Sequence, residues 1–213
     1  MILVNLKAYR EATGKNSAEI ARKAEKAANK TDERVVVAPP PQDIRPVSEH
    51  VETFAQHISP VEPGSHTSRI TAEGVKQAGA TGTILNHSER RIPHEEIRRC
   101  LERADEAGLE TVVSAKNPAE VEKLSSMKPD YIAYEPPELI GGEKAVSDAQ
   151  PDLVREAVEK TAGGVKTLTG AGIQTREDVE RCRELGCSGI LVASAVVKSE
   201  KPQKTIKQLC EGL

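Results

Sequence analysis

The sequence has 213 residues, of which 37% are hydrophobic, 30% are charged and only 2% are aromatic, and its formal net charge at pH 7 is -3. Both charge signs are interspersed, and no run approaches the roughly 18 apolar residues that cross a bilayer. We therefore expect no nucleic acid and no membrane as partners, and one domain over residues 1–213 with a core of Val, Ile, Leu and Ala. The chain opens on Met1-Ile2-Leu3-Val4 without a basic segment, so a cytoplasmic protein is expected.

Short β-rich runs alternate with longer amphipathic stretches along the chain, which is typical of a parallel α/β sheet. The predicted strands are Ile2–Asn5, Val35–Ala38, Phe54–Gln56, Thr83–Leu85, Thr111–Val113, Tyr131–Ala133, Lys166–Leu168 and Ile190–Ala193. The predicted helices are Ser17–Ala28, Ile44–Glu49, Thr71–Ala78, His94–Ala107, Ala119–Ser125, Asp152–Lys160, Arg176–Leu185 and Pro202–Leu209. Eight βα units indicate a (β/α)8 barrel, although a doubly wound sheet gives similar local patterns.

The segment that follows the sixth predicted strand places a lone carboxylate before a stiff loop. Glu135 precedes two prolines, and the loop ends at Gly141-Gly142. Proline fixes φ and cannot extend a strand ladder, so Glu135 is expected at the carboxyl end of its strand. Catalytic groups of α/β barrels lie at that end. The segment therefore predicts a general base next to a lid.

Polar residues also follow the first and fourth predicted strands. Asn5 and Lys7 end the first, and His87 begins a polar cluster after the fourth. Each has an ordinary alternative, because Lys7 could be a solvated loop lysine, His87 a satisfied polar residue and Glu135 an exposed acid. A lysine, a histidine and a glutamate from three strand ends nevertheless form an electrostatic, acid and base set, and together they favour a site.

Two further segments consist of small residues. Gly170-Ala171-Gly172 follows the seventh strand and Ala193-Ser194-Ala195 follows the eighth, where barrels commonly bind phosphate through backbone N–H groups. An ordinary tight turn remains the alternative for the first segment. The spacing of the cysteines matches neither a zinc knuckle nor a CxxC pair, so no chemistry is assigned to Cys100, Cys182, Cys187 and Cys210.

Taken together, these motifs resemble the triosephosphate isomerase family in its short archaeal-type form. The resemblance covers essentially the whole chain. Its segments are Asn5–Lys7, Phe54–His57, Pro63–Thr67, Asn86–Arg90, Tyr134–Gly141, Gly170–Ile173 and Ala193-Ser194. It implies a TIM barrel enzyme that interconverts dihydroxyacetone phosphate and D-glyceraldehyde 3-phosphate, in glycolysis and gluconeogenesis, without a cofactor or a metal.

The resemblance also implies a role for each site residue. Glu135 would move a proton between adjacent carbons, and His87 would polarise the carbonyl and pass a proton between the two oxygens. Lys7 would stabilise the charge of the enediolate, held in place by Glu89. Asn5 would orient the substrate or the lysine, and the phosphate would bind main-chain N–H groups at Ile140, Gly172, Ala193 and Ser194.

In this family the loop at Pro63–Thr67 inserts into a neighbouring subunit, where Thr67 would brace Lys7 and Asn5. The resemblance therefore implies a homo-oligomer, with a homotetramer favoured over a homodimer. His57 and His66 are interpreted as structural or interfacial residues.

The chain departs from the family pattern in two places. Many relatives have Gly-Thr-Gly where this chain has Gly141-Gly142-Glu143, so either Gly142 supplies the hinge freedom or Glu143 repels the phosphate and favours an open lid. Ser114 stands where relatives often carry a cysteine, and no catalytic consequence is drawn from it. Two other functions stay open: another phosphosugar enzyme, with Lys166 as an awkward Schiff-base candidate, and an inactive phosphosugar-binding homologue.

Overall fold

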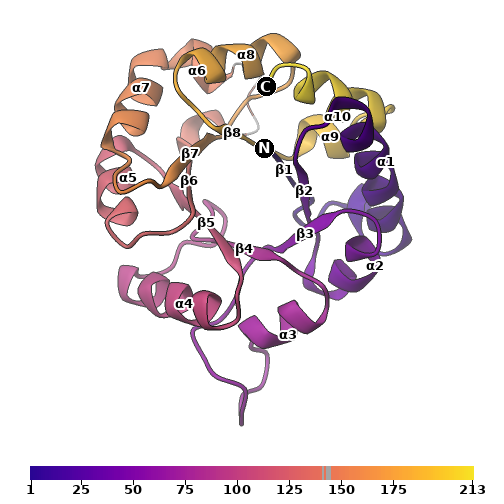
Figure 1. Ribbon diagram of the computed structural model, residues 1–213, viewed down its shortest axis with the longest axis vertical. Coiled ribbons are helices and arrows are strands. Elements are labelled where there is room, and N and C mark those ends of the chain that lie inside the picture. The colour runs from indigo at the N-terminus through magenta and orange to yellow at the C-terminus, as the bar shows by residue number, and fades with distance from the viewer. Residues whose placement is uncertain (141, 143–144) are drawn as a thin grey trace.

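The computed structural model describes residues 1–140, 142 and 145–213. Eight parallel strands form one closed barrel with helices around it (Figure 1). The strands are β1 (Ile2–Asn5), β2 (Val35–Ala38), β3 (Glu52–Ala55), β4 (Gly82–Leu85), β5 (Glu110–Ala115), β6 (Tyr131–Tyr134), β7 (Lys166–Thr169) and β8 (Gly189–Val192). Strand β8 pairs with β1, with Ile190 opposite Ile2, so the sheet is closed. The predicted (β/α)8 barrel is confirmed and the doubly wound sheet is excluded.

Each predicted helix is present, with ends shifted by up to three residues. These helices are α1 (Lys15–Thr31), α2 (Ile44–Ser48), α3 (Ala72–Gln77), α4 (His94–Glu106), α5 (Pro118–Ser125), α7 (Pro151–Lys160), α8 (Arg176–Glu184) and α10 (Pro202–Cys210). Two of them begin at strong caps, because Asn117 accepts a hydrogen bond from the backbone of Glu120 and Thr175 forms a capping box with Asp178. None of the helices among the described residues has the length and apolar character that a membrane span requires.

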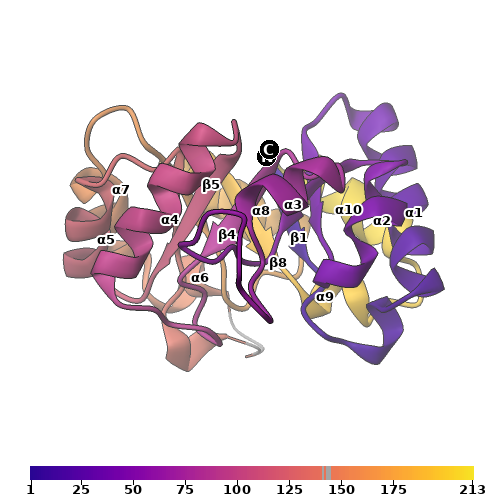
Figure 2. The same cartoon turned by 90° about the horizontal axis from the view of Figure 1, so that it is seen from below.

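Five short elements were missed by the sequence prediction. They are η1 (Arg10–Ala12), η2 (Pro41–Asp43), η3 (Pro137–Leu139), α6 (Val146–Ala149) and α9 (Ser194–Val197). Three or four residues are too few to show a helical period, which is why these five elements could not be predicted from the sequence pattern. The segment 60–69 between β3 and α3 extends away from the barrel, and residues 62–69 are all exposed (Figures 1 and 2).

The barrel interior is filled by alternate strand residues, because successive side chains of a strand point to opposite faces. Apolar residues of the interior include Leu3, Val36, Phe54, Ile84, Val112, Ala133, Leu168 and Leu191. Two positions beyond four of them, toward the carboxyl ends of the strands, stand Asn5, Ser114, Glu135 and Gly170. The apolar interior therefore continues into polar and small residues at the C-terminal end of the barrel.

The opposite end of the barrel carries a charged network centred on Arg34, which precedes β2. Its guanidinium binds Glu52 at the start of β3 through two bonds of 2.9 and 2.6 Å. It also binds Glu110 at the start of β5 and the hydroxyl of Tyr131 at the start of β6. The hydrogen bonds from Arg34 lower the pKa of Glu52 from its ordinary 4.5. One cation thus joins the N-terminal ends of four strands.

The Arg34 network predicts a stability effect that depends on pH. Arg34→Met should lower the free energy of unfolding by about 1–3 kcal/mol at neutral pH, because two partly buried carboxylates lose their cation. The lowered pKa of Glu52 means that its contribution is present above pH 4.5 and is lost as the pH falls through the folded-state value. Urea unfolding of both proteins should therefore show a smaller difference below pH 4.5 than at neutral pH.

Arg181→Met is the matched control, since Arg181 pairs with Glu184 on the exposed surface of α8 at 2.8 Å. That change should cost no more than about 0.5 kcal/mol. An equal loss in both variants would show that the Arg34 network has no special contribution.

Candidate active site

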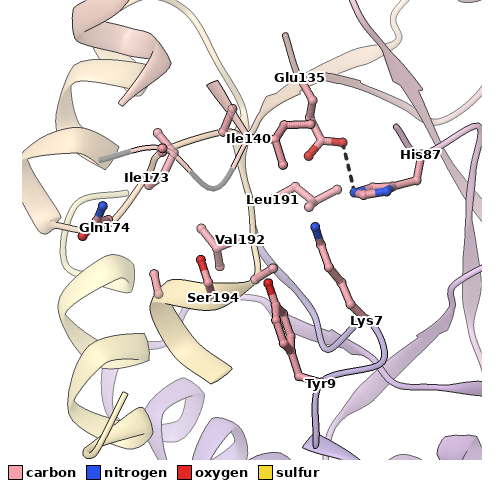
Figure 3. Close-up of a pocket in the computed structure, with 15 residues that line it drawn as sticks. Lys7, Tyr9, His87, Glu135, Ile140, Ile173, Gln174, Leu191, Val192 and Ser194 are labelled. Atoms are coloured by element: carbon pink, nitrogen blue, oxygen red, sulfur yellow. Dashed lines mark ion pairs between the residues drawn. The ribbon is translucent and has the colours of Figure 1, made fainter. Parts of the chain in front are cut away.

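A cavity opens at the carboxyl ends of the strands, where the sequence predicted the site (Figure 3). Its walls come from segments that follow β1, β4, β6, β7 and β8. The lining residues are Lys7, Tyr9, His87, Glu135, Ile140, Gly142, Ala171, Gly172, Ile173, Gln174, Leu191, Val192, Ala193, Ser194 and Ala195. Three predicted catalytic residues and four predicted phosphate-binding residues therefore share one cavity. Asn5 and Glu89 lie beside it, while Thr67 lies in the exposed protruding segment.

Lys7 is held by its backbone as well as by its side chain. Its φ of 48° lies in the left-handed region, which is uncommon outside glycine. The amide of Lys7 donates to Oδ1 of Asn5 at 3.0 Å, and its carbonyl accepts from Nε2 of Gln56 at 2.9 Å. Its ammonium forms an ion pair with Glu89 at 3.0 Å. These contacts hold the cation at the cavity wall despite its unusual backbone conformation.

His87 presents one ring nitrogen to the cavity and binds the protein with the other. Nδ1 accepts a hydrogen bond from the backbone N–H of Glu89 at 3.3 Å. A neutral imidazole that accepts at Nδ1 carries its proton on Nε2. Nε2 is buried, lies 3.8 Å from Oε2 of Glu135, and has no hydrogen-bond partner among the described residues. Nε2 of His87 is therefore a hydrogen-bond donor without an acceptor among the described residues.

Glu135 leaves β6 and turns into the cavity with only 4% of its surface exposed. Its Oε2 accepts a hydrogen bond from the hydroxyl of Ser114 at 2.9 Å. Its Oε1 lies against Gly170, where an added Cβ would stand only 2.9 Å from that oxygen and 2.9 Å from the carbonyl of Leu191. The carboxylate thus fills a close-fitting space at the ends of β5, β7 and β8, and Gly170 is required there for lack of room.

The other wall of the cavity comes from β8 and the segments that follow β7 and β8. Ala171 and Gly172 adopt φ of 77° and 72°, and Ser194 begins the short helix α9. The N–H groups of Val196 and Val197 turn back to the carbonyl of Ala193. The first N–H groups of a helix have no acceptor within it, so those at Ser194 and Ala195 can donate to an anion in the cavity. The small-residue segment that follows β8 is therefore the start of a short helix.

Tyr9 and Ser114 belong to the site, but the sequence assigned no role to them, and Gly170 was predicted as part of a phosphate-binding segment and not as a neighbour of Glu135. Tyr9 lines the cavity beside Lys7, and its ring lies 5.3 Å from the ammonium of Lys198. Its position two residues after Lys7 could have indicated that Tyr9 belongs to the site. Ser114 and Gly170 stand two positions after the interior residues Val112 and Leu168, so strand alternation could have indicated that they face the site.

Lys166 and the four cysteines, which were considered as candidate reactive groups, lie outside the cavity. Lys166 is exposed at the N-terminal end of β7, with its ammonium 5.6 Å from the ring of Tyr131, so it does not enter the barrel interior as a Schiff-base lysine. All four cysteines are buried and unpaired. Burial raises the pKa of the thiols of Cys100, Cys182 and Cys187 to about 12. Within the described parts of the chain, no group of His, Cys, Asp or Glu could hold a metal ion.

The triosephosphate isomerase family model matches residues 1–211. The triosephosphate isomerase of Methanoculleus marisnigri is 42% identical over 213 residues, which cover 98% of this chain and 96% of that protein. That of Caldivirga maquilingensis is 41% identical over 100% of this chain and 97% of its own length, and that of Methanocaldococcus jannaschii is 41% identical over 98% of each. The chain belongs to the triosephosphate isomerase family.

One departure from the triosephosphate isomerase pattern, at the end of the lid, falls on residues that the structure does not describe. Gly141 and Glu143, the residues of the unusual lid end, lie outside the described residues. The described part of the lid, by contrast, contributes Ile140 and Gly142 to the cavity, and the N–H of Gly142 donates to the carbonyl of Leu139 at 3.1 Å.

The two histidines near the protruding segment differ in their surroundings. His66 is exposed, whereas His57 is buried after β3. Burial, with the charges of Arg90 and Arg69 nearby, lowers the pKa of His57 from 6.5 to about 4. His57 is therefore neutral at physiological pH and is part of the folded framework, as the structural interpretation proposed.

The lowered pKa of His57 predicts a loss of stability in acid. The unfolded chain takes up a proton on this ring below about pH 6.5 but the folded protein does so only near pH 4, so the free energy of unfolding falls between these values. In His57→Gln the free energy of unfolding should no longer show this fall between about pH 6.5 and pH 4. Urea unfolding at several pH values across this interval measures the difference. His50→Gln, which changes a half-buried ring outside the protruding segment, should keep the wild-type pH dependence. An unchanged slope in His57→Gln would contradict the assignment.

Proposed function

We propose that this chain is an active triosephosphate isomerase, which interconverts dihydroxyacetone phosphate and D-glyceraldehyde 3-phosphate through an enediolate. The observation that carries this proposal is the meeting of Glu135, His87 and Lys7 in one cavity of a chain that belongs to this family. A base, a neutral donor and a cation are the three groups that the transfer of a proton next to a carbonyl needs.

Glu135 is the base. It takes a proton from the carbon next to the carbonyl and returns it to the neighbouring carbon, so it serves both directions. Its burial supports this role, because a carboxylate in a site with little water makes stronger electrostatic interactions with the reacting atoms.

His87 is the electrophile. Its Nε2 proton has no acceptor among the described residues, and a substrate carbonyl oxygen in the cavity supplies one. The donated hydrogen bond stabilises negative charge on that oxygen as the enediolate forms. The same nitrogen then passes a proton between the two oxygens of the intermediate.

Lys7 stabilises the enediolate charge without giving up its proton. Its ion pair with Glu89 holds the ammonium at the cavity, and Asn5 orients it by accepting the hydrogen bond from its backbone. A preorganised cation costs no reorganisation at the moment of reaction. Asn5 and Glu89 therefore act as supporting residues.

The substrate phosphate binds to backbone N–H groups on the opposite wall. Ile140, Gly172, Ala193 and Ser194 all line the cavity, which supports the role that the family resemblance implied. Closure of the lid at residues 136–142 excludes water and protects the enediolate from loss of phosphate. This enzyme family is itself a standard example of such closure.

Further parts of the proposal rest on the family resemblance. The enzyme needs no cofactor and no metal, consists of one domain, works in the cytoplasm in glycolysis and gluconeogenesis, and forms a homotetramer. The exposed segment at residues 62–69 supports the assembly, because it projects from the barrel where a neighbouring subunit could receive it (Figure 1). Thr67 of one subunit would then approach Lys7 of another.

The central prediction concerns Glu135→Gln in a coupled assay with D-glyceraldehyde 3-phosphate. The change keeps the shape of the side chain but removes the base, so kcat/KM should fall by about 10²–10⁴-fold, or roughly 3–5 kcal/mol of transition-state stabilisation. The affinity for inorganic phosphate, measured by calorimetry, should change far less.

Glu177→Gln on the exposed first turn of α8 is the matched control and should keep full activity. A wild-type kcat in Glu135→Gln would refute the mechanism. A wild-type chain that binds phosphate but shows no isomerase activity would instead support the inactive homologue.

The assembly is tested by sedimentation equilibrium of the whole chain. A homotetramer should have about four times the 23.0 kDa mass of the chain. Half that mass would indicate a homodimer and reject the tetramer, and a monomer would reject the insertion of the protruding segment into a neighbour.

A further inference from the structure

Ser114 makes a hydrogen bond that the family resemblance did not assign. Its hydroxyl donates to Oε2 of Glu135 at 2.9 Å, and the two residues are 1% and 4% exposed. Both side chains enter the barrel interior by strand alternation, Ser114 from β5 after Val112 and Glu135 from β6 after Ala133. A buried hydroxyl at this distance from a buried carboxylate is a strong, directed contact.

The position of Ser114 is itself held by the segment that carries His87. The carbonyl of Ser114 accepts from Nδ2 of Asn86 at 2.9 Å and from Nη1 of Arg91 at 3.4 Å. Arg91 also donates to the carbonyl of Asn86 at 3.2 Å and binds Glu120 on α5. The ends of β4 and β5 are thereby joined, and the serine and the histidine belong to one framework.

The hydrogen bond distinguishes the two oxygens of Glu135. Oε2 is bound by Ser114 and is the oxygen nearest to Nε2 of His87. Oε1 lies beside Gly170, and in Figure 3 it is directed toward the cavity. Rotation of the carboxylate would exchange the two oxygens, and the bond from Ser114 opposes that rotation.

We propose that Ser114 is a positioning residue of the isomerase reaction, which anchors Oε2 of Glu135 so that Oε1 receives the substrate proton. The inference rests on the proposed function, because it names the residue that aims the base. The bond also stabilises the ionised carboxylate, since it is donated to the charged form. Ser114 thus acts on the base and does not contact the substrate.

The charged groups that face Glu135 come from the other strand ends. His87 after β4 lies 3.8 Å away, and Lys7 after β1 lines the same cavity, with Glu89 paired to it. On the remaining sides, β7 presents Gly170 and β8 presents the carbonyl of Leu191. A change at Ser114 leaves all of these groups in place, so its effect can be separated from theirs.

The test compares Ser114→Ala with wild type in kcat and KM. Loss of the anchor should lower kcat by about tenfold to a hundredfold, the effect of a misaligned reacting group. KM should change by less than about threefold, because Ser114 does not touch the substrate.

Ser114→Cys, which keeps a weak donor of similar size, should have a kcat between those of wild type and Ser114→Ala, and it replaces Ser114→Ala if that variant fails to fold. Ser125→Ala removes another buried hydroxyl, which donates to the backbone carbonyls of Glu122 and Lys160, and should leave kcat and KM unchanged.

An unchanged kcat in Ser114→Ala, or a rise in KM as large as the fall in kcat, would overturn the positioning role. If Glu135→Gln is inactive at the same time, the proposed isomerase function stands and only the role of Ser114 falls. If Glu135→Gln is fully active, the function itself fails. The two results are therefore distinguishable.

Discussion

The two-residue alternation of strands in a closed barrel is the constraint on which the site depends. Along β5 and β6 the interior positions pass from Val112 and Ala133 to Ser114 and Glu135 without a change of direction. On each of these strands, the residue that packs the core is followed, at the next inward-facing position, by the residue that faces the site. A slip of one residue in the register between β5 and β6 would turn the serine and the glutamate away from each other.

The barrel also separates stability from chemistry along its axis. Arg34 joins Glu52, Glu110 and Tyr131 at the N-terminal ends of the strands, away from the described residues that line the active-site cavity. At the other end, Lys7 has a left-handed backbone that is held by hydrogen bonds to Asn5 and Gln56. The charged network therefore stabilises one end of the barrel, and the reacting groups lie at the other.

The strands, the long helices and the three groups of the proposed reaction were predictable from sequence because their signals are local. Glu135 stands next to prolines, and β8 has an uninterrupted apolar run. Helix α9 was missed because four residues carry no period. The role of Ser114 could not be predicted either, because a hydrogen bond between β5 and β6 requires their register, which single-strand patterns do not specify. Thr67 is a different case, since its expected partner is another chain.

His87 presents its hydrogen-bond donor where the reaction needs one. Four buried side-chain atoms lack a hydrogen-bond partner among the described residues, and of these only Nε2 of His87 faces the cavity. A carbonyl oxygen placed against Nε2 accepts this hydrogen bond, and the bond strengthens as the oxygen becomes negative along the reaction. The contact therefore favours the enediolate over the substrate, which is the preference that catalysis requires.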